Sequence, residues 1–445
     1  MAAREAPQVL RGMRDYLPTR MILRQYVVDV LRDVFERFGF EPLETPAIEY
    51  AETLEGKFGE EADKLIYRFE DRGGRRVGLR YDLTVPLARV VAMYPDLVKP
   101  FKRYQIAPVW RAEKPQRGRY REFYQCDVDI VGSASTLADA EVVLVADFAL
   151  GQLGFSRFRI KLNNRKLLAA LAQYAGVPGE HIGDIYRAID KLEKVGQEAV
   201  RDELRRYGVP SVAISRLLEL VQIQGEPAAI LSQARESLAA LPKGLEGIDE
   251  LEQMVTHLRQ MDVAAERLQV DLSMVRGLGY YTGPIFEVVV EEPKIGSICG
   301  GGRYDGLVGL LGGQNLPAVG VSFGLERIID VLEELELATE RVAKTKTGVL
   351  VTLFGPETRS ESLGLVSELR RVGINAEVFL GPERLPNQLR YASRKGIPYV
   401  AVLGPDEVAR GVVLVKDMAT GEQKSYERAA VAGALLAVLR PEHGR

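Results

Sequence analysis

The chain has 445 residues, a length that suggests two to three domains. Hydrophobic residues make up 46% of it and charged residues 27%, which excludes disorder as its main state because enough apolar surface is available for a core. Its formal net charge of -3 excludes a uniformly basic coat for nucleic acid, although a local basic site remains open.

Cysteine and histidine are rare in this sequence. Cys126 and Cys299 are its only two cysteines, and its three histidines are scattered singly. These counts exclude a disulfide framework and a zinc cluster built from cysteine and histidine. They fit a reducing compartment, so we expect a cytoplasmic protein, and we assign no metal-ligating residues.

Two segments bear on whether the chain enters a membrane. The N-terminus carries Arg4, Glu5 and Arg11 and lacks the apolar core of a signal peptide. The longest uncharged stretch, 306–325, contains six glycines and Pro317, a composition that predicts turns and short strands. We therefore expect no membrane segment.

The first part of the chain predicts a helix followed by a strand-rich region. Apolar residues recur at helical spacing over 20–38, and Gly39 is a suitable C-terminal stop. Residues 40–46 predict an extended segment bounded by prolines. The pattern from about 75 to 132 predicts short strands and turns, and 136–150 predicts another helix.

A long helical block interrupts the strands. Nearly all of 166–266 has helical periodicity, and glycine and proline divide it into separate predicted helices at 167–174, 185–207, 214–222, 228–241 and 248–268. Residues 284–291 are again strand-like. A block of this kind between β-rich segments indicates an insertion into a larger fold.

The C-terminal part predicts a separate domain. Residues 338–347 are polar and typical of a linker. Beyond them strands and helices alternate, which predicts a small α/β domain with a largely parallel sheet. The predicted strands are 349–354, 376–380, 399–403 and 412–415, and the predicted helices are 357–371, 384–394 and 426–439.

The segment with the most unusual charge is 101–121, which holds seven basic residues and one acid, Glu113. Arginine side chains can grip phosphate as planar forks, although a solvated basic loop remains an alternative. The strand-like segment that follows places Phe123, Gln125, Asp127 and Asp129 on one face. Arginines beside carboxylates suit a polyphosphate together with a cation such as an amino group.

Several strings here resemble those of a known enzyme family. Arg111-x-Glu113 with Arg121-x-Phe123, and residues 317–327 ending in Gly-Leu-Glu-Arg, resemble the second and third motifs of class II aminoacyl-tRNA synthetases. More specific to the histidyl-tRNA synthetases are the strings at 11–18, 79–86, 276–283 and 300–307. The resemblance covers essentially the whole chain. One departure is Gly279, where the family usually has aspartate.

The resemblance implies a fold and an assembly. The fold is α+β: a class II catalytic domain at 1–335, an antiparallel sheet flanked by helices and carrying the insertion at about 166–266. A linker at 336–347 leads to an α/β anticodon-binding domain at 348–445. The helix at 20–38 and the segment after it correspond to the family's first motif, which implies a homodimer.

The resemblance also implies a reaction and a set of ATP-binding residues. Histidine would be joined to tRNA(His) with ATP through a histidyl-adenylate, with Mg²⁺ as cofactor. Arg111 would hold the α-phosphate and the amino-acid carboxylate, Glu113 would accept from the adenine amino group, and Phe123 would stack on adenine. Arg121 and Arg327 would bind the β- and γ-phosphates.

The implied histidine-binding residues come from three other segments. Asp82, Thr84 and Gln125 would bind the ammonium group of L-histidine, and Asp129, Tyr281 and Tyr280 would surround its imidazole. Arg276 would act with Arg111 as a catalytic residue by placing a fixed charge against the α-phosphate. Taken singly, each residue has a structural interpretation: Asp82 and Thr84 as a helix cap, the two tyrosines as strand packing, and Arg276 as a salt bridge.

Two other functions stay open at this stage. One is the non-catalytic paralogue that regulates ATP phosphoribosyltransferase, which typically lacks the C-terminal domain that this chain keeps. The other is a synthetase for a different amino acid, against which the string at 276–283 argues. Amino-acid-dependent ATP–pyrophosphate exchange would separate all three.

Overall fold

The computed structural model describes residues 7–56, 63–115, 118–177, 181–275, 279–293, 295–338, 342–381 and 384–439. Contacts divide the chain into two compact units. The first comprises Met1–Asp15 and Val27–Ala338, and the second comprises Tyr16–Tyr26 and Thr339–Arg445. Within the described residues, no helix is both long enough and apolar enough to cross a membrane.

The first unit is built on an eight-stranded sheet in the order β1-β5-β6-β11-β10-β9-β7-β8. The five inner pairings are antiparallel, whereas the outermost strand at each edge pairs in parallel. The strands are β1 (Glu41–Pro42), β5 (Phe101–Trp110), β6 (Glu122–Val131), β7 (Phe158–Asn164), β8 (Leu268–Val270), β9 (Pro284–Val290), β10 (Ser297–Arg303) and β11 (Ala318–Gly324).

Helices cover this sheet through apolar contacts. The helix predicted at 20–38 is α1 (Pro18–Arg37), and its Phe35 ring lies 5.8 Å from the ring of Tyr104 on β5 and 5.5 Å from that of Phe323 on β11. Helix α5 (Thr136–Gln152), whose N-terminus is capped by Ser135, packs on β11, and α14 (Leu325–Glu334) packs on β6. These contacts fix the inner strands that carry the polar residues described below.

One element contradicts the prediction of strands and turns over 75–132. Thr84–Met93 forms a helix, α4, although Val85, Val90 and Val91 favour strands by intrinsic propensity. Six of its ten residues are buried, and it packs against α2 (Ala51–Leu54) and α13 (Leu307–Leu310). Tertiary packing has therefore overridden local propensity here.

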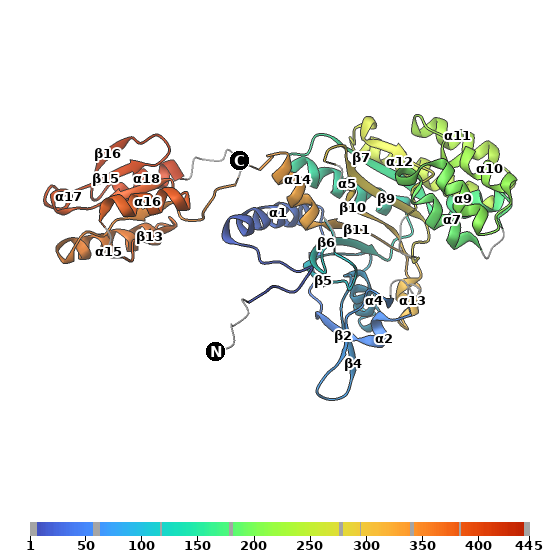
Figure 1. Ribbon diagram of the computed structural model, residues 1–445, viewed down its shortest axis with the longest axis horizontal. Helices are drawn as coiled ribbons and strands as arrows, with labels where there is room; N and C mark the ends of the chain where they lie inside the picture. Colours follow the sequence, from blue (N-terminus) through green and yellow to red (C-terminus); the bar gives the residue numbers. More distant parts are fainter. Residues whose placement is uncertain are drawn as a thin grey trace, which may run out of the picture. The chain divides into compact units, whose positions relative to one another are not determined.

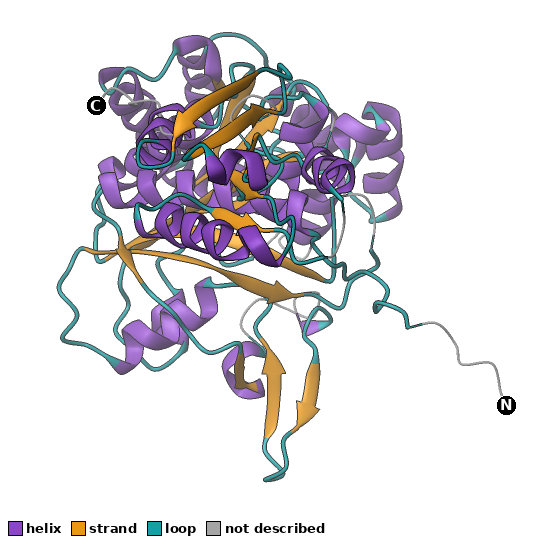
Figure 2. Cartoon of the chain, turned by 90° about the vertical axis from the view of Figure 1, so that its left-hand side faces the viewer, coloured by secondary structure: helices purple, strands orange, loops and turns teal. Residues whose placement is uncertain are grey.

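A second sheet of three strands belongs to the same unit. Its order is β2-β4-β3, with β2 (Ile48–Tyr50), β3 (Arg68–Glu70) and β4 (Arg76–Leu79) all antiparallel. The turn between β3 and β4 is closed by the carboxylate of Asp71, which accepts from the backbone of Gly73 and Arg75. In Figure 2 this hairpin projects away from the large sheet.

The helical insertion leaves the sheet after β7 and returns at β8. Its helices are α6 (Arg165–Tyr174), α7 (Ile182–Ile189), α8 (Leu192–Val195), α9 (Gln197–Arg206), α10 (Ser211–Val221), α11 (Pro227–Ser237) and α12 (Pro242–Gln260), followed by η2 (Ala265–Arg267). The single helix predicted at 185–207 is divided among α7, α8 and α9, and Gly196 adopts φ 81° between the last two. In Figure 1 these helices gather beside the β7 end of the sheet.

The second unit contains a five-stranded sheet in the order β13-β12-β14-β15-β16. Pairings among β12 (Val349–Val351), β13 (Ala376–Val378) and β14 (Tyr399–Val402) are parallel, whereas those of β15 (Val412–Asp417) and β16 (Gln423–Glu427) are antiparallel. The sheet is thus mixed rather than largely parallel. Helices α15 (Pro356–Arg371), α16 (Leu385–Lys395), α17 (Pro405–Ala409) and α18 (Val431–Leu439) complete the unit.

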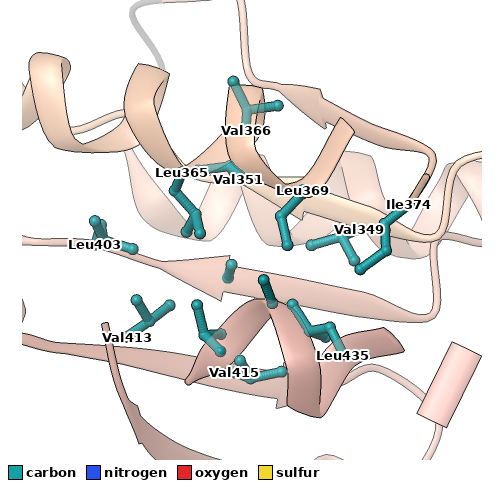
Figure 3. Packing of buried hydrophobic residues seen from close by; sticks show 13 residues of the cluster. Val349, Val351, Leu365, Val366, Leu369, Ile374, Leu403, Val413, Val415 and Leu435 are labelled. Carbon is teal, nitrogen blue, oxygen red and sulfur yellow. The ribbon is translucent and has the colours of Figure 1, made fainter. Parts of the chain in front are cut away.

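Alternation along these strands divides the core into two layers. Val349 and Val351 pack with Leu365 and Leu369 of α15 and Leu435 of α18 on one face, as Figure 3 shows. Leu350 points to the other face and packs with Ala392 of α16 and Val400. The helix predicted at 426–439 begins only at Val431, because residues 426–427 belong to β16 and 428–430 form a turn.

Candidate functional site

A cavity of about 390 Å³ opens on the large sheet of the first unit. Its lining comes from the inner strands β6, β10 and β11, from the start of α4, and from the loop between β5 and β6. The lining residues that the sequence singled out are Asp82, Thr84, Arg111, Glu113, Phe123, Gln125, Asp127, Asp129, Tyr280, Tyr281 and Arg327. The fold therefore brings together residues that are far apart in the chain.

One end of the cavity carries arginine. Arg327, at the start of α14, donates from Nε to the carbonyl of Gly118 at 3.0 Å and from Nη1 to that of Ser297 at 2.5 Å. Burial lowers the pKa of Arg327, with Arg119 beside it acting in the same direction, but a guanidinium stays charged at neutral pH. Arg119 also lines the cavity, 3.8 Å from the carboxylate of Glu113. This end suits an anion.

Arg111 and Phe123 lie between the two ends. The Nε of Arg111 donates to the carbonyl of Tyr81 at 3.0 Å, and its guanidinium carbon lies 5.0 Å from the centre of the Phe123 ring. The backbone of Arg111 meets that of Arg121 across the β5–β6 hairpin, where the N–H of Arg111 donates to the carbonyl of Arg121, while Phe123 faces Val109 on β5. Arg111 is thereby held through its Nε, and it lines the cavity.

Arg121 lies differently from the other arginines. Its Nε donates to the carbonyl of Glu113 at 3.1 Å and its Nη1 to that of Arg11 at 3.3 Å. It is not among the residues that line the cavity, whereas its neighbour Arg119 is. The phosphate-binding role of Arg121 stays a prediction.

The opposite end is lined by buried carboxylates. Asp82 is 2% exposed, and its Oδ1 accepts from the backbone N–H of Val85 at 3.1 Å. Its Oδ2 has no hydrogen-bond partner among the described residues. Asp82 thus accepts from the first turn of α4 and also lines the cavity, and its role in binding an ammonium group stays a prediction. Thr84 follows it at the start of α4 and also lines the cavity.

Asp127 and Asp129 project from β6 into the same end. Asp129 forms an ion pair at 2.7 Å with the fully buried Arg103, which faces it on β5, and accepts a hydrogen bond from Tyr304. Asp127 faces Ser322 of β11, and its Oδ1 has no hydrogen-bond partner among the described residues. Gln125, earlier on the same strand, donates to Ser322 at 2.7 Å.

Burial shifts the pKa of each of these acids upward. Removal from water raises the pKa of Asp82 to about 6, against the opposing effects of the Val85 N–H and Arg111. The same cause raises the pKa of Asp127 to about 7, opposed by Arg103 and reinforced by Asp129. The pKa of Asp129 is also raised by burial, while Arg103 and Tyr304 offset part of the shift. A cationic ligand would relieve this unfavourable burial of charge.

Aromatic residues close the carboxylate end. Tyr281 is buried, its ring centre lies 4.5 Å from that of Tyr280, and Tyr280 meets Tyr304 edge-on at 5.8 Å. Arg276, predicted as a catalytic residue, lies outside the described residues. Its role therefore stays a prediction.

Two glycines let the strands under the cavity approach closely. A Cβ on Gly301 of β10 would lie 1.8 Å from the carbonyl oxygen of Gly320 on β11, and a Cβ on Gly320 would lie 2.0 Å from Asp129 Oδ1. Any other residue would push the strands apart or displace the carboxylate. The glycine-rich string noted in the sequence is thus required by strand packing against the site.

Sequence reasoning assigned no role to four residues that the structure places in or against the site. Arg119 and Asp127 line the cavity directly, and Arg103 and Tyr304 contact Asp129. Strand alternation had already placed Asp127 on the correct face. The pairing of Arg103 with Asp129 follows from the β5–β6 register, which the sequence did not reveal.

The arrangement can bind one ligand of mixed charge, or two ligands end to end. Arginines at one end suit phosphate oxygens, while buried acceptors at the other suit an ammonium group and N–H donors. Arg111 lies where the two ligands would meet. These features fit the joining of a cationic small molecule to a polyphosphate.

Comparisons with known proteins agree with this picture. Residues 12–328 match the family model described as "Histidyl-tRNA synthetase", and residues 348–437 match the one described as "Anticodon binding domain". A histidine–tRNA ligase of Aeropyrum pernix is 47% identical over 424 residues, which cover 94% of this chain and 95% of that protein. One of Cytophaga hutchinsonii is 42% identical over 441 residues, covering 94% and 97%.

A solved structure extends the likeness to three dimensions. The crystal structure of a histidyl-tRNA synthetase from Nostoc sp. superposes with a TM-score of 0.85 at 32% sequence identity, covering 96% of this chain and 98% of that one. The mixed eight-stranded sheet with its flanking helices, and the separate C-terminal sheet, are therefore those of a class II synthetase. The chain belongs to the histidyl-tRNA synthetase family.

Proposed function

We propose that the chain ligates L-histidine to tRNA(His) at the expense of ATP, through a histidyl-adenylate and with release of pyrophosphate and AMP. The observation that carries this proposal is the cavity itself, which has arginine at one end and buried carboxylates at the other. Family membership supplies the reaction, and the distribution of charge in the cavity is what its two small substrates require.

ATP occupies the arginine end in this proposal. Glu113 accepts from the adenine amino group, Phe123 stacks on the ring, and Arg327 with Arg121 binds the β- and γ-phosphates. Glu113, Phe123 and Arg327 line the cavity. Because Arg119 lines it as well, we add Arg119 to the phosphate-binding residues.

Histidine occupies the carboxylate end. Asp82, Thr84 and Gln125 receive the ammonium group, and their positions at the start of α4 and on β6 support this role. Asp129, Tyr280 and Tyr281 also line the cavity and would surround the imidazole. Arg276 completes the set by analogy with the family.

Adenylate formation depends on positioning the two substrates and not on proton transfer. The attacking group is a carboxylate that is already ionised at neutral pH, so no general base is required for adenylate formation. Arg111, whose Nε is held by the Tyr81 carbonyl, aligns the carboxylate with the α-phosphorus and stabilises the negative charge that builds up there. Arg111 and Arg276 are therefore the proposed catalytic residues.

Magnesium is the cofactor that this reaction implies. In the part of the chain that the structure describes, no group of three or more His, Cys, Asp or Glu side chains is placed to hold a metal ion. Mg²⁺ is usually held by one or two carboxylates together with phosphates and water. Glu287 and Glu326, which line the cavity with Arg327, fit this need and would hold the ion, which would neutralise phosphate charge.

The remaining proposals concern the rest of the molecule. We assign 1–335 to the catalytic domain with its insertion at about 166–266, 336–347 to a linker, and 348–445 to anticodon binding, supported by the match over 348–437. By analogy with the family, the protein is a cytoplasmic homodimer in which α1 and β1 belong to the interface.

Amino-acid-dependent ATP–pyrophosphate exchange, measured with each of the twenty amino acids, tests the proposal. Histidine alone should support exchange, and the full-length protein should then charge tRNA(His). Histidine binding without exchange would instead support the regulatory paralogue. Exchange with another amino acid would identify a different synthetase.

A further inference from the structure

We propose that residues 11–14, which we call the brace, position the loop 118–121 for ATP, and that Arg14 is the positioning residue of this brace. The inference rests on the proposed function. It gives a role to the string at 11–18, from which the proposed reaction takes no residue. Contacts made by Arg11, Gly12 and Arg14 join the brace to the loop.

The first contact joins Arg14 to Tyr120. Nη1 of Arg14 donates to the hydroxyl of Tyr120 at 2.9 Å, and the guanidinium carbon lies 3.9 Å from the centre of the Tyr120 ring. The two residues are 106 positions apart in sequence, and both are half-buried. A guanidinium that stacks on a ring and also hydrogen-bonds to it restricts the orientation of that ring. Arg14 therefore fixes Tyr120, which lines the cavity.

The second contact is made by the backbone of the brace. The N–H of Arg121 donates to the carbonyl of Gly12 at 2.8 Å, and Nη1 of Arg121 donates to the carbonyl of Arg11. The carbonyl of Arg121 in turn accepts from the N–H of Arg111 at 2.9 Å. The backbone of Arg121 therefore connects the brace to Arg111, one of the two proposed catalytic residues.

Gly12 allows the brace to approach the loop this closely. Its φ of 90° lies in a region that L side chains rarely adopt. A Cβ at this position would lie 2.9 Å from Cγ of Arg121 and 3.1 Å from Cγ of Pro115. Glycine is therefore required at position 12 both for its backbone conformation and for its lack of a side chain.

The other end of the loop is held by α14. Nε of Arg327 donates to the carbonyl of Gly118 at 3.0 Å. With Gly118 held by Arg327 and Tyr120 held by Arg14, both neighbours of Arg119 are fixed. Arg119 lines the cavity, and its side chain is 48% exposed, so it can turn toward a ligand. An arginine on a fixed loop binds phosphate more tightly than one on a mobile loop, because less ordering is needed on binding.

This arrangement separates the nucleotide from the amino acid. Arg14 is not among the residues that line the cavity, so it acts on ATP through Tyr120 and the loop rather than by contact. The residues proposed to bind the ammonium group of histidine belong to other segments, at the start of α4 and on β6. Loss of Arg14 should therefore affect the use of ATP far more than the binding of histidine.

The test is ATP–pyrophosphate exchange by full-length variants. These are Arg14→Ala, Arg14→Lys, Tyr120→Phe and the double variant of Arg14→Ala with Tyr120→Phe. For each, kcat and the KM values for ATP and for histidine are measured. The matched control is Arg267→Ala. The Arg267 guanidinium lies 4.5 Å from the centre of the Phe158 ring and pairs with Asp147 at 2.7 Å, and none of these three residues lines the cavity.

We expect Arg14→Ala to raise the KM for ATP by about tenfold or more and to lower kcat, while the KM for histidine changes by less than about twofold. Tyr120→Phe removes only the hydroxyl, so its effect should be smaller. The double variant should be no worse than Arg14→Ala, because the two residues act as one unit. Arg14→Lys should recover part of the loss, since an ammonium keeps the charge without the planar fork. Arg267→Ala should change neither KM.

Three results would overturn the inference. The first is an unchanged KM for ATP in a folded Arg14→Ala. The second is an equal change in the KM values for ATP and histidine, which would indicate general disruption of the site. The third is normal exchange with slower charging of tRNA, because the loop would then serve the tRNA rather than ATP.

If Arg14→Ala does not melt cooperatively, Arg14→Lys and Tyr120→Phe take its place. Both keep most of the side-chain volume, and an unchanged KM for ATP in both would likewise overturn the inference. Failure of the wild-type protein to show histidine-dependent exchange would instead count against the proposed function. The two failures are therefore distinguishable.

Discussion

Arg303 of β10 and Asp139 of α5, which are 164 residues apart in sequence, form a buried bidentate ion pair. Nε of Arg303 lies 3.1 Å from Oδ1 of Asp139, and its Nη2 donates to Oδ2. The same guanidinium donates to the carbonyls of Ser133 and Ser135, at 2.9 and 3.1 Å. One side chain thus joins the end of the glycine-rich strand to the loop that starts α5, and the next residue, Tyr304, donates to Asp129 in the cavity.

Removing Arg303 should destabilise the first unit strongly. Arg303→Ala leaves a buried carboxylate and two carbonyls without their donor, a change that costs about 3–5 kcal/mol for a buried pair. Urea unfolding of Arg303→Ala, Asp139→Ala and the double variant should show that the two effects are far from additive. Arg159→Ala, which breaks the half-exposed pair with Glu291, should cost less than about 1 kcal/mol. Additive losses at Arg303 and Asp139 would contradict the coupling.

Gly320→Ala should damage histidine binding without touching the nucleotide end. The added methyl group would lie 2.0 Å from Asp129 Oδ1, so either the carboxylate or strand β11 must move. We expect the KM for histidine to rise by about tenfold or more, which corresponds to about 1.4 kcal/mol, with little change in the KM for ATP. Gly183→Ala, in open space on α7, is the matched control and should leave both constants unchanged. Equal changes in both constants would point to general disruption.

The stability of the substrate-free protein should depend on the charge of Asp127. Its pKa is raised to about 7 by burial, above the value near 3.8 of an exposed aspartate, so the folded state holds the proton more tightly than the unfolded state. Stability should therefore fall as pH rises from about 4 to about 7, and level off above that. Asp82, with its pKa raised to about 6, contributes in the same direction.

Asp127→Asn removes this dependence, because an amide does not titrate. Its melting temperature relative to the wild type should therefore rise between pH 5 and pH 7.5, as measured by thermal melts without substrate. Asp406→Asn, an exposed position in the second unit, is the control and should show no such trend. A constant difference at all pH values would mean that Asp127 is ionised throughout.

Arg276 lies outside the described residues, so its proposed role depends on the family resemblance and needs kinetics. Arg276→Ala should lower the rate of adenylate formation by about 10²–10³ while substrate binding changes little. Arg276→Lys should recover part of the rate, since an ammonium lacks the planar fork. Pre-steady-state adenylation measures both, with the half-exposed Arg259 replaced by alanine as a control. A near-normal rate in Arg276→Ala would leave this residue structural.

Ending the chain after Thr347 should separate adenylation from charging. Every proposed histidine- and ATP-binding residue precedes that point, so ATP–pyrophosphate exchange should persist. Charging of tRNA should fall by about tenfold or more, because contacts with the anticodon and the counterion release that accompanies them are lost. A truncated protein that melts cooperatively, and still charges tRNA as well as the full chain, would contradict the assignment of 348–445.

The part of the site that lies on a single strand could be predicted from the sequence. Alternation on one strand placed Phe123, Gln125, Asp127 and Asp129 on a common face, and all four line the cavity. The partners of these residues could not be predicted in the same way. Arg103 meets Asp129 only through the register of β5 and β6, and Tyr304 reaches it across 175 residues of sequence.

The fold likewise could be predicted where the local sequence determines an element, and could not where distant contacts determine it. The helix at 20–38 and the helical insertion were predicted from periodicity, which packing then reinforced. Helix α4 was missed because its valines favour strands, and only burial between α2 and α13 makes it helical. The start of α18 was placed too early because β16 is exposed and polar, so only its pairing with β15 identifies it as a strand.

The position of the insertion has a consequence for how the first unit folds. Its ends lie on adjacent strands, since β7 and β8 pair in parallel with Ile160 opposite Leu268. Closing a flexible loop of that length would cost about 2 kcal/mol more than closing a crossover of a dozen residues, because each doubling of loop length adds about 0.6 kcal/mol. Helices α6 and α12, the first and last of the insertion, pack against each other, and α12 also packs against α5. We therefore expect the pairing of α6 with α12 to bring the two ends of the insertion together and so to place β8 at the edge of the sheet.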